Sequence, residues 1–121
     1  MAKTVLVVDD SNSLRVVVRM ALTGVGYNVI EAADGQAGLA LLDGRQISLT
    51  ICDVNMPVLN GIEFVKAAKL LPAYKFMPIM MLTTESQEAK RNEGKAAGAR
   101  AWMVKPFSTS QLITAVDKLC A

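Results

Sequence analysis

Five side chains that could do chemistry each stand where a short apolar run of the sequence ends. Asp9 and Asp10 follow the first run, Asp53 the third, Thr83 the fourth and Lys105 the fifth. Each residue alone is ordinary, because aspartates often close turns and lysines often lie on the surface. In open α/β sheets, however, ligands bind beyond the carboxyl ends of the strands. We therefore expect all five side chains to meet at one site.

The expected site combines three carboxylates with one ammonium group, which leaves two negative charges in excess. A compact site tolerates this excess only if a carboxylate takes up a proton or a cation enters. The chain has no histidine, and a set of oxygen ligands favours Mg²⁺ over zinc or copper. Mg²⁺, Lys105 and the Thr83 hydroxyl could stabilise a phosphoryl group while a carboxylate attacks it in line. The central carboxylate, Asp53, is the expected nucleophile.

The apolar runs also predict the elements that position these residues. Runs without polar alternation are typical of strands covered on both faces of a parallel sheet. Four such runs are Val5 to Val8, Ile47 to Cys52, Met77 to Leu82 and Ala101 to Val104, and a weaker fifth is Asn28 to Ala32. A helix-like stretch follows each run. Strand and helix repeated five times predict an α/β fold, with helices on both faces of a doubly wound, five-stranded parallel sheet.

Capping residues and helix breakers set the expected limits of the helices. The predicted helices are Asn12 to Thr23 after Ser11, a stretch between Asp34-Gly35 and Gly44, Ile62 to Leu71 before Pro72, Gln87 to Ala97 after Ser86, and Thr109 to Cys120 after Ser108.

The first predicted helix has two apolar ridges. The expected core stripe consists of Leu14, Val17, Val18, Ala21 and Val25. Val16 and Met20 form a second ridge, which indicates either a wide buried face or a surface for a partner protein.

Length and composition indicate one domain over residues 1–121, with no output domain after the fifth helix. The chain has 121 residues, of which 52% are hydrophobic and 20% charged, so disorder is excluded. A net charge of +2 does not indicate a nucleic-acid or membrane partner. Cys52 and Cys120 have no metal-site or redox spacing and are expected to be free thiols. With no signal peptide or membrane span, we expect a cytoplasmic monomer.

These residues and their spacing resemble the CheY-like receiver family of two-component signalling over essentially the whole chain, and the family has a flavodoxin-like fold. The matching features are the Asp9-Asp10 pair, Asp53 within Cys-Asp-Val-Asn-Met-Pro, Thr83, and Lys105 followed by Pro106. The resemblance implies that Asp53 is phosphorylated, that Asp10 binds Mg²⁺ directly and that Asp9 does so mainly through water.

The resemblance assigns further roles. It implies that Asn55 supplies a metal ligand through its backbone carbonyl and that Thr83 and Lys105 contact the phosphoryl group. The peptide bond between Lys105 and Pro106 is expected to be cis, as is usual in the family. Trp102 stands at the switch aromatic, which in relatives is usually Tyr or Phe.

Three positions near the site bear on the lifetime of the phosphoryl group. Asn55 and Glu85 occupy places that tune the rate of dephosphorylation in relatives. Thr84 is bulkier than the small residue that is common there, which narrows access to the phosphoryl group.

The implied function is a phosphorylation-activated switch that promotes only its own phosphorylation and dephosphorylation and is not otherwise an enzyme. Its implied donor is a histidine kinase or phosphotransfer protein. Its reader would contact the fourth helix, fifth strand and fifth helix, with chemotaxis and the flagellar motor switch as the favoured pathway and target. Glu88 and Arg91 replace a basic and an apolar type found in chemotaxis relatives, so a receiver in another phosphorelay is an alternative.

Two alternatives come from other classes of protein. A haloacid-dehalogenase-like phosphohydrolase also uses Asp, Thr, Lys and Mg²⁺, but it needs a second aspartate two residues after the nucleophile. That residue is Asn55, which cannot transfer protons. A flavodoxin-like electron carrier needs a phosphate loop after the first strand, where Asp9 and Asp10 would repel phosphate.

Overall fold

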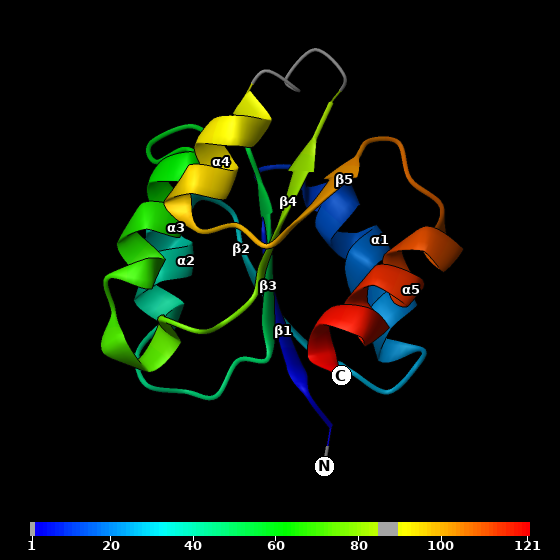
Figure 1. Cartoon of the computed structure of the whole chain (residues 1–121). Coiled ribbons are helices and arrows are strands. Elements are labelled where there is room, and N and C mark those ends of the chain that lie inside the picture. Colours follow the sequence, from blue (N-terminus) through cyan, green and yellow to red (C-terminus); the bar gives the residue numbers. More distant parts are fainter. Residues whose placement is uncertain (1, 85–89) are drawn as a thin grey trace.

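The structure is a computed structural model that describes residues 2–84 and 90–121. All five strands are parallel and form one sheet, ordered β2-β1-β3-β4-β5 (Figure 1). The strands are β1 (Thr4–Val8), β2 (Asn28–Ala32), β3 (Leu49–Asp53), β4 (Ile79–Thr83) and β5 (Ala101–Val104). Since β1 and β3 are neighbours, their carboxyl ends lie together at the middle of one sheet edge.

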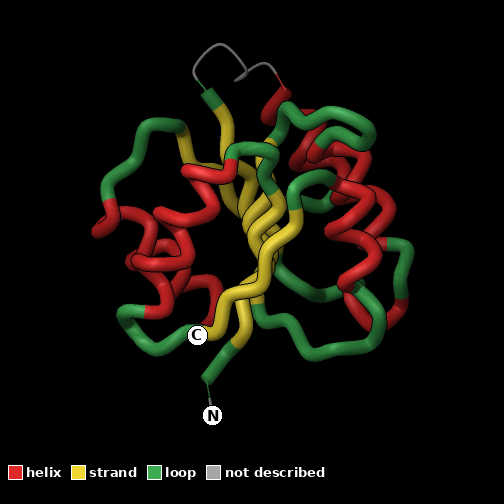
Figure 2. The backbone as a smooth tube through the Cα atoms, turned by 180° about the vertical axis from the view of Figure 1, so that it is seen from behind, coloured by secondary structure: helices red, strands yellow, loops and turns green. Residues whose placement is uncertain are grey.

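Helices cover both faces of the sheet, which confirms the predicted doubly wound fold. They are α1 (Asn12–Thr23), α2 (Gly35–Leu41), α3 (Gly61–Lys69), α4 (Arg91–Ala97) and α5 (Thr109–Cys120), with a short 3₁₀ helix η1 (Pro72–Tyr74) after α3. Helices α1 and α5 lie on one face, and α2, α3 and α4 lie on the other (Figure 1). Figure 2 shows the strands as a single central layer between these two groups of helices.

Two strands begin later than predicted. Strand β3 begins at Leu49, which pairs with Val5, and Ile47 is buried in the preceding loop. Strand β4 begins at Ile79 because Pro78 has no backbone N–H to donate to a neighbouring strand. The Pro78 carbonyl still accepts a hydrogen bond from the Thr50 amide at 3.1 Å. Apolar runs therefore mark buried segments more reliably than they mark the first paired residue.

Side-chain caps fix the starts of several helices. The Ser11 hydroxyl accepts from the Leu14 amide, and Asn60 with Glu63 forms a capping box that begins α3 one residue earlier than predicted. Helix α3 ends at Lys69, two residues before the predicted end, and α2 ends at Leu41, before the predicted stop. The predicted fourth helix began at Gln87 with Ser86 as its cap, and both residues lie outside the described part of the chain.

The core stripe of α1 differs from the prediction. Val18 and Leu22 are fully buried against the α1–α5 face of the sheet, whereas Val17 is 51% exposed and Val25 50% exposed. Residues four apart lie on the same helix face, so Leu22 is buried together with Val18. Val17 lies on a neighbouring face of the helix, which is exposed to solvent. The predicted inward orientation of Val17 and Val25 is wrong, and Met20 is also exposed, at 67%.

None of the helices in the described ranges is both long enough and apolar enough to cross a membrane.

Candidate functional site

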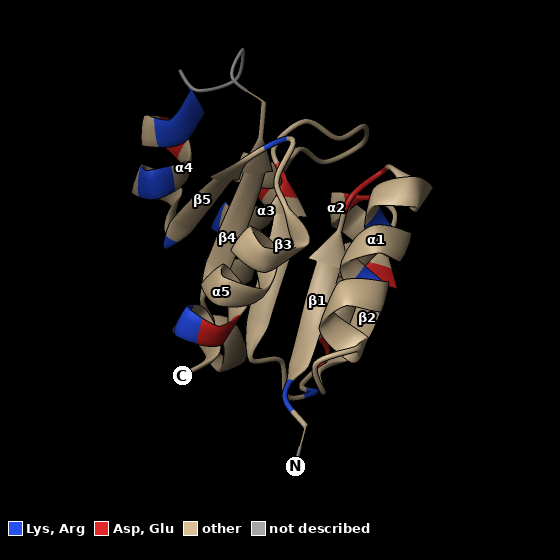
Figure 3. Cartoon of the chain, turned by 90° about the vertical axis from the view of Figure 1, so that its right-hand side faces the viewer, with Lys and Arg blue, Asp and Glu red and all other residues tan. Residues whose placement is uncertain are grey.

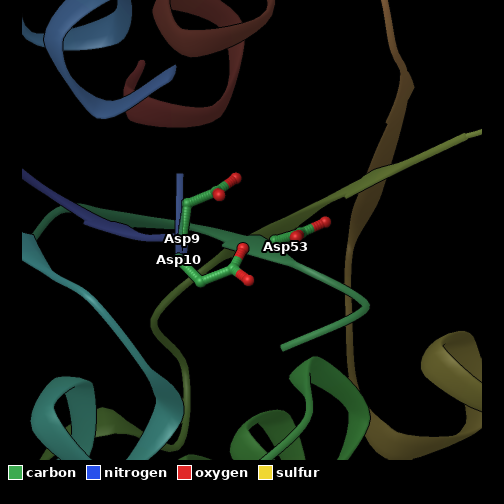
Figure 4. A group of neighbouring side chains, drawn as sticks. All are labelled: Asp9, Asp10 and Asp53. Carbon is green, nitrogen blue, oxygen red and sulfur yellow. The ribbon is translucent and has the colours of Figure 1, made fainter. Parts of the chain in front are cut away.

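Three carboxylates meet at the carboxyl ends of the two central strands. Asp9 and Asp10 directly follow β1, and Asp53 is the last residue of β3. One carboxylate oxygen from each residue lies within 4.8 Å of the others (Figure 4). Asp9 is completely buried and Asp53 nearly so, while Asp10 is exposed. The cluster therefore has a buried floor and one side open to solvent.

Lys105 reaches this cluster from the edge strand β5, which is separated from β3 by β4. It follows β5, and its backbone amide donates to the Thr83 carbonyl at 2.7 Å, which ties it to the end of β4. Its Nζ lies 3.1 Å from Asp53 Oδ1 and 3.6 Å from Asp9 Oδ2. The next peptide bond, between Lys105 and Pro106, is cis. One ammonium group thus pairs with two of the three carboxylates.

Burial, more than neighbouring charge, perturbs the two buried carboxyl groups. Burial raises the pKa of Asp9, and repulsion from Asp53 raises it further, although the Ser11 amide opposes the change by donating to Asp9 Oδ1 at 2.8 Å. Burial also raises the pKa of Asp53, against the lowering effect of Lys105. Both shifts disfavour the ionised form of the two buried carboxyl groups, and a bound cation would favour it.

The residues of the cluster fit a magnesium ion. Asp9 Oδ2 is buried and accepts no hydrogen bond from any residue in the described ranges, so it has ligand capacity to spare. The neighbouring donors are also carboxylate oxygens, the ligand type that hard divalent cations prefer. Asp9, Asp10 and Asp53 are the residues that could hold the ion.

Thr83 lies next to the cluster at the end of β4. It is 1% exposed, and the residue before it, Leu82, pairs directly with Asp53. The Thr83 hydroxyl donates to the Thr84 carbonyl at 3.1 Å. Thr83 is thus the last residue of β4, directly after the residue that pairs with Asp53.

Trp102 lies deeper in the sheet, two residues before the carboxyl end of β5. It pairs with Met81 on β4 and packs, half-buried, against the core on the α2–α4 side. Its indole N–H is buried and donates to no residue in the described segments. The ring therefore keeps its position by packing rather than by a hydrogen bond.

Two further predicted positions relate to the site differently. Asn55 is exposed two residues beyond Asp53, and its backbone amide helps to lower the pKa of the Asp53 carboxyl. Glu85 lies outside the described residues.

Two residues support the site through contacts that the sequence alone does not show. Arg15 on α1 donates to the Asp9 carbonyl and pairs with Glu31 on β2 at 3.3 Å, which fixes the turn that carries the acidic pair. Gly61 approaches the end of β3 so closely that an added Cβ would lie 2.2 Å from the Asp53 carbonyl oxygen. The sequence features that could have indicated these supports are an arginine soon after the acidic pair and a glycine directly after the helix cap Asn60.

Comparison with known proteins defines the class of this fold and site. Residues 5–117 match the family model of the response regulator receiver domain. The chain therefore belongs to the receiver domain family, and it is CheY-like. This assignment also decides against the phosphohydrolase and the electron carrier.

Individual relatives support the same class. The chain is 38% identical over 109 residues to a chemotaxis protein CheY homolog of Campylobacter jejuni, covering 88% of this chain and 84% of that protein. It is 30% identical over 116 residues to chemotaxis protein CheY of Pseudomonas aeruginosa, covering 95% and 94%. The solved structure of chemotaxis response regulator CheY4 of Vibrio cholerae is similar with a TM-score of 0.93 and 46% identity, covering 98% and 99%.

The crowded carboxylates predict an unusual effect on stability. Asp53→Asn is expected to raise the melting temperature of the metal-free protein by roughly 3 to 6 °C, because the amide removes one of three neighbouring negative charges. Mg²⁺ is expected to stabilise the wild type more than this variant. Thermal unfolding in EDTA and in Mg²⁺ measures both effects.

Asp43→Asn is the matched control, because Asp43 is exposed and pairs with Arg45 at 2.9 Å away from the cluster. It should not raise the melting temperature. A lower melting temperature for metal-free Asp53→Asn than for the wild type would show that repulsion is not a dominant feature of the site.

Proposed function

We propose that this protein is a signalling switch that accepts a phosphoryl group on Asp53 in a reaction that depends on Mg²⁺. The observation that carries the proposal is the ion pair of 3.1 Å between Lys105 Nζ and Asp53 Oδ1, beside the carboxylates of Asp9 and Asp10. A cation, a nucleophile and a metal-binding pair thus converge at the open edge of the sheet. Membership of the receiver family supports the same chemistry.

The proposed donor is a phosphohistidine on a sensor kinase or phosphotransfer protein. A carboxylate oxygen of Asp53 attacks the phosphorus in line, the P–N bond breaks, and its electron pair stays on the imidazole nitrogen. Bound Mg²⁺ supplies positive charge to the phosphoryl oxygens. Lys105 turns its ammonium group to the same oxygens, and the Thr83 hydroxyl donates a hydrogen bond to them.

The proposed cycle modifies only the protein itself, so no separate substrate is turned over. Attack by water on the acyl phosphate returns Asp53 to its free carboxylate. We propose that Asn55, which is exposed beside the site, and Glu85 tune the rate of this step, and that Thr84 narrows the approach of water.

A groove beside the site could accommodate part of the phosphodonor protein. Its volume is about 560 Å³, and it runs from Leu14 and Val17 on α1 to Thr84, Lys105 and Phe107. Val17 and Met20 are exposed on the same helix, so the apolar surface of α1 is centred on these residues, whereas Val16 is half-buried. We propose that the histidine-bearing helix of the donor docks there.

We propose that the activated protein signals through the face made by α4, β5 and α5, in chemotaxis. The names of the Campylobacter, Pseudomonas and Vibrio relatives support this pathway, and the flagellar motor switch is the corresponding target. A cavity of about 740 Å³ between β5 and α5 is lined by Trp102, Gln111 and Lys118. The basic side of α4 carries Arg91 and Lys95 (Figure 3).

Arg91 is the feature that favours the second pathway, a phosphorelay outside chemotaxis, because chemotaxis relatives carry an apolar type there. In either pathway the proposed setting is the cytoplasm, where the buried free thiols of Cys52 and Cys120 stay reduced.

Incubation with acetyl phosphate tests the proposed function without a partner protein. With Mg²⁺, intact-mass spectrometry should show one added phosphoryl group per chain, and EDTA should prevent the addition. Equal labelling in Mg²⁺ and in EDTA would contradict the proposed chemistry.

The switch itself is expected to be visible in the fluorescence of Trp102, the only tryptophan. Beryllofluoride forms a phosphoryl-like adduct with a carboxylate. The adduct on Asp53 should attract the Thr83 hydroxyl, and the movement of Thr83 should change the space beside the Trp102 ring. Beryllofluoride with Mg²⁺ is therefore expected to change the emission of wild-type Trp102. Most of this change should disappear in Thr83→Ala, while the quenching caused by Mg²⁺ alone should persist.

An identical response to beryllofluoride in Thr83→Ala would show that Trp102 senses the site without the hydroxyl. The proposed coupling through Thr83 would then be wrong.

A further inference from the structure

The contact between Gly94 on α4 and Trp102 on β5 is too close for any side chain at position 94. An added Cβ would lie 2.4 Å from Trp102 Cζ2 and 2.5 Å from Cη2. These two atoms belong to the six-membered ring of the indole, and both reach beyond the volume of a phenylalanine ring. Helix α4 therefore lies directly on the part of the ring that tryptophan adds.

The same ring lies on the face of the sheet that carries Thr83. Trp102 pairs with Met81, and Thr83 is two residues further along β4. Side chains two apart on a strand point to the same face, so Thr83, Met81 and Trp102 share the face that α4 covers. The indole thus contacts α4 and shares a face of the sheet with the side chain at the carboxyl end of β4.

Among the described residues, packing alone holds the ring in this place. The indole N–H is buried and has no acceptor among the residues of the described segments, so no hydrogen bond fixes the orientation of the ring. Gly94 is itself buried, and its bare backbone forms the surface on which the ring rests. A change of shape at position 94 must therefore move the ring, the helix or both.

We propose that Gly94 is a positioning residue for Trp102, and that the contact between them transmits movement of the ring to α4. Glycine at 94 provides the space that lets a tryptophan occupy the place of a smaller aromatic residue. When the end of β4 rearranges around the modified Asp53, the ring shifts and the backbone of α4 shifts with it. The second half of this inference rests on the proposed function, and the first half does not.

A double-mutant cycle tests the steric half. Gly94→Ala is expected to lower the melting temperature of the wild type, because the methyl group overlaps the ring. The same substitution in Trp102→Phe is expected to raise the melting temperature, because the overlapping atoms are gone and alanine favours a helix more than glycine does. The prediction is therefore a reversal of sign between the two backgrounds.

Asn92→Ala is the matched control, because Asn92 is an exposed residue of the same helix. Its effect should have the same sign and size in both backgrounds. If Gly94→Ala lowers the melting temperature of the wild type and of Trp102→Phe equally, the two residues are not a steric pair and the inference fails.

Backbone amide chemical shifts test the coupling half. In the wild type, beryllofluoride with Mg²⁺ is expected to shift the amides of Val54 and Asn55, next to Asp53, and those of Lys95 to Ala97 on α4. In Trp102→Ala the shifts next to Asp53 should persist, while those on α4 should fall to less than half. Gly94→Ala should also reduce the α4 response, and a merely structural glycine would not have this effect.

The outcomes separate the two proposals. If the amides next to Asp53 respond in Trp102→Ala and the α4 response is unchanged, the ring does not transmit the signal and the coupling is wrong. If wild-type Val54 and Asn55 do not respond at all, the proposed function is wrong and the coupling fails with it. The stability cycle decides the steric half in either case.

Discussion

Replacing Asp53 with asparagine is expected to abolish the addition of a phosphoryl group from acetyl phosphate. The amide has no nucleophilic carboxylate oxygen, and the buried carboxylate of Asp9 is not placed to substitute for it. Asp9 is fully buried, with Oδ1 accepting from the Ser11 amide, and Lys105 makes its hydrogen bond to Asp53 Oδ1. Intact mass in the presence of Mg²⁺ measures the loss.

Asp43→Asn serves as the control for this experiment, since it removes a carboxylate that is exposed and paired with Arg45. It should label like the wild type. Labelling of Asp53→Asn to the wild-type extent would assign the reaction to another residue and refute the role of Asp53.

The second large effect concerns the metal. Asp10→Asn is expected to weaken Mg²⁺ binding by at least about tenfold and by more than Asp9→Asn does. Asp10 is exposed on the open side of the cluster, so both of its oxygens can face a hydrated ion. Asp9 already commits Oδ1 to the Ser11 amide, and its implied contact with the metal is mainly through water.

Isothermal titration calorimetry with Mg²⁺ gives the order of the two effects. Far-ultraviolet circular dichroism should confirm that both variants are folded. Equal losses, or a larger loss for Asp9→Asn, would show that the roles of the two aspartates are reversed or shared.

Most of the fold follows from local patterns in the sequence. The four strong apolar runs and the weaker Asn28 to Ala32 run all become strands, and a helix follows each of them in the described chain. The starts of two helices were predictable because Ser11 and Ser108 are typical capping residues, and each hydroxyl accepts from the amide three residues later.

Features that depend on packing between distant elements could not be predicted. Val17 and Leu22 are both apolar, so the sequence alone did not show that Leu22 faces the sheet and Val17 faces solvent. Which side of a helix is buried depends on how the helix packs against the sheet, and that packing depends on side chains throughout the core.

The residues of the site could be predicted from the sequence, but their hydrogen bonds and packing contacts could not. The rule that parallel strands end at one edge brought together the three carboxylates and Lys105. It did not reveal that Asp9 Oδ2 accepts no hydrogen bond within the described chain. Nor did it reveal the contact between Gly94 and Trp102, whose two residues are brought together by the position of α4 on β5.

The location of the phosphoryl group tests the central claim most directly. Treatment of the labelled protein with borohydride reduces an aspartyl phosphate to homoserine, and peptide mass spectrometry then identifies the modified position. We predict homoserine at residue 53 and at neither residue 9 nor residue 10, and only after labelling in the presence of Mg²⁺. Homoserine at residue 9 or 10, or a phosphate that survives reduction on a serine or threonine, would contradict the account.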